Sequence, residues 1–296
     1  MRILFVADKF DDEKRDEVSR FPGGAELTDA AVIEACPFEI KKIKFSDLEI
    51  SECIKYDITI IGNCKTATKE QLSYISSGKN YILFEHDMRI CRYDGDFSRA
   101  KKEPIHYFLK RCICPHMNFK KLYRNSMGVI FLTHRQYDVY KKNPFFKIKK
   151  ARFLESSAFG KSFFKRVEKF RKKNIQKSGT VIFYSPHSFK GYKESREYCI
   201  KSGIDPLEIS DITPDEVLEV FEKAEQFVYL PVGTEGAGRM PVEARFLGCE
   251  VIVNDNVGVS GEAWWNKSDP EAYEFVKDTP DRFWRIVEKI SNENTD

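Results

Sequence analysis

The sequence lacks any apolar run that approaches the roughly 20 residues of a membrane-spanning helix. Its opening, MRILFVADKF, is too short an apolar stretch and becomes charged too early to be a signal peptide. The eight cysteines follow no repeating spacing, which favours reduced thiols over a disulfide framework. These absences predict a soluble cytoplasmic protein with no transmembrane segment.

Metal-binding motifs are also scarce. Cys112, Cys114 and His116, with Cys91 upstream, would supply four ligands of the types that zinc takes. Two residues, rather than one, more often separate the cysteines of a tetrahedral site. We therefore predict no metal and no resident cofactor, and this cluster stays open as the alternative.

The length indicates more than one domain. A chain of 296 residues is long for one hydrophobic core and suits two domains of roughly 150 residues each. The hydrophobic content of 42% is ample for buried cores, and 32% charged residues is high without indicating disorder.

The net charge of +3 conceals an uneven distribution. Residues 99–174 carry 22 lysines and arginines against four acidic side chains, a net +18, which leaves −15 on the rest of the chain. Such a block favours a polyanionic partner: nucleic acid, an anionic membrane surface or a phosphorylated glycan. Its interleaved aromatic residues suit either the stacking of bases or an amphipathic helix at a membrane, although part of the block is ordinary solvated helix surface.

The most informative stretch is residues 226–262. It reads as a buried strand at 227–232, a glycine-rich turn, a helix at 239–247 and a second buried strand at 251–254. Glu235 and Glu243 flank the start of this helix, and Gly236 and Gly238 allow a ligand to approach the backbone closely. The free N–H groups of a helix N-terminus bind anions. The stretch therefore predicts a site for a phosphate ester beside carboxylates that accept hydroxyl hydrogen bonds.

Two N-terminal stretches support the same reading. An apolar strand at 2–8 is followed by Gly23, Gly24 and a helix at 25–36, which again places a helix N-terminus after a strand. Glu85, His86 and Asp87 follow the strand at 81–84, and α/β proteins place chemistry at that end of a parallel strand. The alternative is a capped strand end, in which His86 pairs with Asp87 or Glu85.

The C-terminal motif resembles the donor-binding motif of retaining family 4 glycosyltransferases of the GT-B fold. That motif runs Glu, Gly, aromatic, Gly, three mostly apolar residues, Glu, Ala. The chain resembles a compact member of the family, of a phage or viral type. The matching positions are Glu235, Gly236, Ala237, Gly238, Arg239, Met240, Pro241, Val242, Glu243 and Ala244.

The resemblance implies roles on the donor side. Glu235 would contact hydroxyls of the transferred sugar and Glu243 the ribose, with the N–H groups of residues 237–240 near the sugar and the diphosphate. The Gly-Gly-Ala-Glu sequence that begins at Gly23 would face the diphosphate across the cleft. Lys190, followed by Gly191, matches the second member of the basic pair that holds the diphosphate. These residues, with Ser185 and Met240, make up the implied donor site.

Three departures from the family pattern stand out. Ala237 replaces the usual aromatic residue, and Arg239 stands where an apolar residue is common. The first basic residue of the pair falls on Tyr184 or Ser185. We hypothesise that Arg239 or Lys193 supplies the missing charge.

On the acceptor side the resemblance implies a histidine at the end of an N-domain strand and a glutamate after a glycine loop. His86 and Glu262 are the candidates, with Asp87 beside the histidine. The expected catalytic residues are accordingly Glu235, His86 and Lys190.

These observations predict an α/β protein of the GT-B type, with two Rossmann-like domains facing a cleft. We expect an N-terminal acceptor domain at 1–160, a linker at 161–175, a donor domain at 176–275 and a helix at 276–296 that packs back on the N-terminal domain. The implied activity is metal-independent transfer, with retention, from a nucleotide-diphosphate sugar to a hydroxyl of a lipid-linked or surface saccharide.

Two alternatives remain. The acceptor is a hydroxylated base in DNA, as in phage DNA modification, or the chain binds a sugar nucleotide or glycan without turnover. A location at the inner membrane surface, with peripheral membrane contact, is compatible with the saccharide acceptor.

Overall fold

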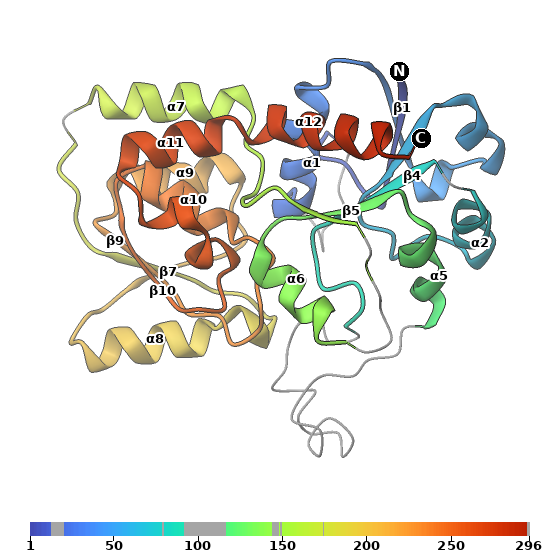
Figure 1. Cartoon of the computed structure of the whole chain (residues 1–296). Coiled ribbons are helices and arrows are strands. Elements are labelled where there is room, and N and C mark those ends of the chain that lie inside the picture. The colour runs from blue at the N-terminus through green and yellow to red at the C-terminus, as the bar shows by residue number, and fades with distance from the viewer. Residues whose placement is uncertain are drawn as a thin grey trace, which may run out of the picture.

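A computed structural model describes residues 1–12, 21–78, 80–91, 117–143, 148, 150–173 and 175–294. Within these ranges the chain forms two α/β domains, each built on a fully parallel sheet and placed side by side (Figure 1). No described helix is long and apolar enough to cross a bilayer.

The N-terminal domain contains a six-stranded sheet in the order β2-β1-β3-β4-β5-β6. Its central strands are buried on both faces, as the continuous apolar runs RILFVA and YILFE require. The strands are β1 (Arg2–Ala7), β2 (Glu39–Lys44), β3 (Ile58–Ile61), β4 (Tyr81–Glu85), β5 (Gly128–Phe131) and β6 (Ala151–Phe153).

The side-chain alternation of these strands divides the core of this domain in two. Phe5 and Phe84 lie in the cluster that also holds residues of α1 (Gly24–Glu34) and α12 (Thr279–Asn292). Leu4 and Leu83 lie in the cluster on the other face. The helical elements of this domain are α1 (Gly24–Glu34), α2 (Lys69–Ser77), α5 (Met117–Asn125) and α6 (His134–Lys141), with short 3-10 turns at Phe45–Asp47 and Ile50–Lys55.

The C-terminal domain contains a four-stranded sheet in the order β10-β9-β7-β8. Helix α8 covers one face, and α7, α9, α10 and α11 lie over the other (Figure 1). The strands are β7 (Thr180–Phe183), β8 (Leu207–Ile209), β9 (Gln226–Tyr229) and β10 (Glu250–Val253). The helical elements are η3 (Ser188–Lys190), α8 (Tyr192–Lys201), α9 (Pro214–Lys223), α10 (Arg239–Phe246), η4 (Gly258–Gly261), η5 (Ala263–Asn266) and α11 (Asp269–Lys277).

The segment expected as a linker contains a regular helix, α7 (Lys161–Arg171). Phe163, Phe164 and Val167 turn one face of α7 into the core, and Arg166 Nε donates to Glu222 Oε1 of α9 at 2.8 Å. The connection between the domains is therefore packed against the C-terminal one.

The last helix, α12 (Thr279–Asn292), returns to the N-terminal domain (Figure 1). Trp284 Nε1 donates to the Val32 carbonyl of α1 at 2.7 Å, and the Ile290 side chain packs over Gly128, where a Cβ would lie 2.9 Å from it. One apolar cluster consequently runs from the N-terminal sheet through α12 to the C-terminal sheet.

Candidate functional site

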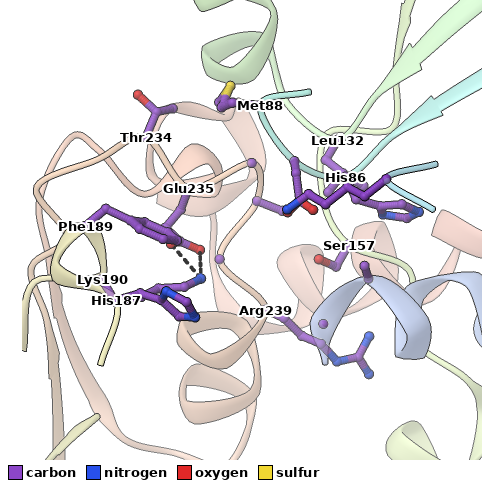
Figure 2. Close-up of a pocket in the computed structure, with 17 residues that line it drawn as sticks. His86, Met88, Leu132, Ser157, His187, Phe189, Lys190, Thr234, Glu235 and Arg239 are labelled. Carbon is purple, nitrogen blue, oxygen red and sulfur yellow. Dashed lines mark hydrogen bonds and ion pairs between the residues drawn. The ribbon is translucent and has the colours of Figure 1, made fainter. Parts of the chain in front are cut away.

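A cleft of about 310 Å³ lies between the two domains, at the carboxyl ends of their strands (Figure 2). Parallel α/β sheets place their ligands at this edge. The N-terminal domain contributes Gly24, Ala25, Lys65, His86, Asp87, Met88, Leu132 and Ser157, and the C-terminal domain contributes His187, Phe189, Lys190 and residues 234–239.

The glycine-rich turn after β9 reaches this cleft because two of its residues have no side chain. A Cβ on Gly236 would lie 2.5 Å from the His86 carbonyl oxygen, so the turn touches the N-terminal domain directly. Gly238 adopts φ of +88° as the N-cap of α10, and a Cβ there would meet Val257. Both positions exclude larger residues for reasons of space and conformation.

Hydrogen bonds fix the turn to both domains. Thr133 Oγ1 donates to the Gly236 carbonyl at 2.5 Å. The same hydroxyl accepts from the backbone N–H of Gln136 and so caps the N-terminus of α6. On the other side the Glu235 amide donates to the Asn256 carbonyl at 2.8 Å. The turn is therefore held in place before any ligand arrives.

Lys190 and Glu235 form an ion pair across the C-terminal side of the cleft (Figure 2). Lys190 Nζ lies 2.8 Å from Glu235 Oε1 and 2.9 Å from Oε2, and 29% of the lysine side chain remains exposed. Tyr229 lies beneath the pair, and burial together with the Glu235 carboxylate raises the pKa of its hydroxyl. The pair offers one ammonium and one carboxylate to a ligand in the same place.

Gly191 positions Lys190. It has φ of +69°, and a Cβ there would lie 1.9 Å from the Leu230 carbonyl oxygen, so only glycine allows the loop to turn so close to β9. The backbone of Phe189 accepts from the amides of Val232 and Gly233 at 3.0 and 3.1 Å. The loop that carries Lys190 is thus tied to the strand that leads to Glu235.

His86 lines the cleft, but its ring is turned toward α1 and away from Lys190 and Glu235 (Figure 2). His86 Nε2 pairs with Asp29 Oδ1 of α1 at 2.6 Å, and both side chains are buried. Burial disfavours the imidazolium, but the Asp29 carboxylate outweighs it and raises the pKa of His86 above its ordinary value. The ring holds the end of β4 against α1, and the main chain of His86 forms the wall of the cleft.

Arg239 and Glu243 form a second ion pair. Figure 2 shows the Arg239 side chain directed away from Lys190 and Glu235. Arg239 Nε lies 2.8 Å from Glu243 Oε1, Nη1 donates to the Ala158 carbonyl at 2.7 Å, and the guanidinium lies 4.1 Å from the centre of the Phe159 ring. Burial raises the pKa of Glu243 and lowers that of Arg239. Glu243 is not among the residues that line the cleft, and its contact with the ribose, which the resemblance implies, stays a prediction.

Of the other residues expected at the site, some line the cleft and some do not. Gly24 lines the cleft, and Gly23 caps α1 by donating its amide to Glu26 Oε2 at 2.9 Å. Asp87 is exposed and lines the cleft from the N-terminal domain. Ser185 and Met240 do not line the cleft.

Glu262 also lies outside the lining and joins the two domains. Its carboxylate accepts from the His134 amide at 2.8 Å, and His134 Nδ1 lies 2.9 Å from Oε2. Burial raises the pKa of Glu262. His134, Glu155 and Glu262 bring their ligand atoms within 4.8 Å of one another, which makes them a group in the described part of the chain with the geometry for a metal ion.

Of the zinc alternative, Cys112, Cys114 and His116 lie outside the described residues. Cys91, the fourth candidate ligand, is buried.

Several lining residues were not expected from the sequence. Lys65, Met88, Leu132, Ser157 and Thr234 carry no motif and meet only through the folding of two domains. The sequence did contain a signal for His187 and Phe189, because they lie in the loop that follows strand β7 and precedes Lys190.

Comparison with solved structures identifies the fold. HepE from Anabaena in complex with UDP is 12% identical, with a TM-score of 0.52 over 99% of this chain and 93% of that one. The same protein in complex with UDP-glucose gives 14% identity and a TM-score of 0.51, over 98% and 92%. The chain has the GT-B fold.

A further GT-B neighbour is T4 phage BGT in complex with UDP-glucose, at 12% identity and a TM-score of 0.47 over 99% of this chain and 95% of that one. No family model and no curated protein matches the sequence. The likeness to HepE, at 12–14% identity, establishes the fold alone, and function has to be argued from the cleft.

The buried position of Glu243 makes a testable prediction about stability. We expect Glu243→Gln to lower the free energy of unfolding by about 2–4 kcal/mol, because it leaves the buried Arg239 guanidinium without its carboxylate. Urea denaturation measures this. The exposed Glu219→Gln on α9 is the matched control, and we expect a change within about 0.5 kcal/mol. An unchanged stability together with lost donor binding would instead support a ribose contact.

The His86–Asp29 pair makes a prediction about pH. The folded-state pKa of His86 is raised above its ordinary 6.5, so its stabilising contribution is fully present below pH 6.5 and is lost as pH rises through the folded value. Unfolding free energies measured from pH 6 to pH 9 should fall less steeply for Asp29→Asn than for the wild type. Parallel curves for the two proteins would contradict this account of the pair.

Proposed function

We propose that the chain is a retaining glycosyltransferase that takes a sugar from a nucleotide-diphosphate sugar, with UDP-glucose as the first donor to test. The observation that carries the proposal is the Lys190–Glu235 ion pair beside the Gly236–Gly238 turn, in a cleft between two Rossmann-like domains. HepE, which has the same fold, is described in complexes with UDP and UDP-glucose.

The proposed roles follow from the chemistry of the pair. Lys190 would donate to the diphosphate and stabilise the charge that develops on it as the sugar leaves. Glu235 would accept hydrogen bonds from sugar hydroxyls. The backbone N–H groups at the start of α10, after Gly238, and of α1, after Gly23, would add partial positive charge. In this proposal these groups act without a metal ion.

The N-terminal domain would hold the acceptor. Asp87 lines the cleft with an exposed carboxylate, so we assign it the contact with the acceptor hydroxyl. His86 becomes a positioning residue, because its ring is engaged by Asp29 while its main chain supports the Gly236 turn. Glu262 would act by joining the domains through His134 rather than by touching the acceptor.

For the acceptor we propose an anionic saccharide, lipid-linked or at a surface, handled by a cytoplasmic protein at the inner membrane face. The +18 charge of residues 99–174 favours a polyanion. The same charge also supports the second candidate, a hydroxylated base in DNA. Steep salt dependence of DNA binding would favour DNA, because phosphate contacts release counterions.

A thermal-shift panel with UDP, GDP, ADP and CMP sugars tests the donor site. We predict that one nucleotide class raises the melting temperature by about 5 °C at a hundred times its Kd. Lys190→Met should abolish most of that shift, because the ammonium is lost from the cleft. Lys193→Met, an exposed lysine outside the cleft lining, is the matched control and should keep it.

Two results would argue against the donor site. The first is the absence of a shift with any donor, which would leave the basic block as the place to look for function. The second is a shift that Lys190→Met leaves intact. Binding without cleavage of the donor would favour the non-catalytic alternative, a protein that binds sugar nucleotides.

A further inference from the structure

The cleft needs more positive charge than Lys190 alone provides. This argument rests on the proposed function. The diphosphate of a nucleotide sugar carries two negative charges at neutral pH, and the Lys190 ammonium is shared with the Glu235 carboxylate. A second cation near Lys190 would add to the partial charge of the helix N-termini in offsetting the leaving diphosphate.

The two residues first considered for that charge are poorly placed. The Arg239 guanidinium is bound to Glu243, to the Ala158 carbonyl and to the Phe159 ring, and it points away from Lys190 (Figure 2). Lys193 is exposed on the first turn of α8 and does not line the cleft. Neither supplies charge at the ion pair.

His187 is well placed. Its side chain lines the same cleft as Lys190, and His187 is the N-cap of the 3-10 turn η3 that carries this lysine. The ring lies 5.7 Å from that of Phe189, centre to centre. The backbone holds the residue firmly: its amide donates to Ser185 Oγ at 3.2 Å, and its carbonyl accepts from the Lys190 amide at 3.0 Å. Ser185 thus positions His187 instead of lining the cleft.

We propose that His187, as an imidazolium, is the second cation of the diphosphate site and acts together with Lys190. The charged residues that line the same cleft are Lys190, Glu235, Lys65, Asp87 and Arg239. An imidazole changes its charge in the neutral pH range, and a bound diphosphate favours the charged form. Donor affinity therefore decreases as pH rises through neutrality.

The test measures the Kd of UDP-glucose by calorimetry at pH 6.0 and pH 8.5. UDP-glucose is the right probe because its diphosphate is esterified at both ends and keeps its charge over this range, whereas the terminal phosphate of UDP titrates near pH 6. We expect wild-type affinity to fall by about ten-fold between the two pH values.

Two variants separate charge from shape. His187→Arg keeps a cation at every pH, so we expect it to bind at pH 8.5 about as tightly as at pH 6.0. His187→Gln keeps a hydrogen-bonding side chain without charge, so we expect weak binding, about ten-fold below wild type at pH 6.0, and no pH dependence. Lys193→Gln is the control and should follow the wild type.

The outcomes distinguish this inference from the proposed function. Wild-type binding with the same pH slope and affinity in His187→Gln would overturn the role of His187 and leave the donor site standing. An absence of wild-type binding to UDP-glucose and to the other nucleotide sugars would overturn both. Melting temperatures without ligand confirm that each variant is folded.

Discussion

The close contact between the Gly236 turn and the end of β4 is the constraint on which the site depends. The turn of one domain can lie against the His86 carbonyl of the other only because Gly236 has no Cβ, and Thr133 then anchors the Gly236 carbonyl. The ion pair between Asp29 of α1 and His86 holds the end of β4 in this position from the side of α1. Main-chain contacts between the two domains therefore determine the shape of the cleft. The charged side chains of the cleft extend from these fixed main-chain segments.

The ion pairs Lys190–Glu235 and Arg239–Glu243 have the same N–O distance of 2.8 Å but differ in their exposure to the cleft. Lys190 and Glu235 face the cleft, where the partly exposed ammonium can exchange a protein carboxylate for a ligand phosphate. Arg239 and Glu243 are more buried and join α10 to the Ala158 carbonyl of the N-terminal domain. A buried pair is costly to break, so Arg239 is best understood as a structural contact between the domains.

The sequence was sufficient for the fold, since apolar runs such as RILFVA and the glycine-rich turn define strands and helix starts locally. The sequence motifs also pointed to Gly24, Asp87, Lys190 and Glu235 as site residues, and all four line the same cleft in the structure. The sequence did not show that the Glu243 side chain is buried. Its position depends on the ion pair with Arg239, which lies one helical turn earlier on the same face of α10. Nor could the sequence assemble the wall formed by Met88, Leu132 and Ser157, which depends on how two domains meet.

We propose that the cleft cleaves a nucleotide sugar with retention, and NMR of isotopically labelled UDP-glucose would follow both the cleavage and the configuration of the product. The account predicts release of UDP with the sugar leaving in the α configuration of the donor, in slow hydrolysis or on an added acceptor. The same signal should be lost in Lys190→Met. A donor that binds but stays intact over long incubation would contradict the claim of catalysis, and a β-configured product would contradict retention.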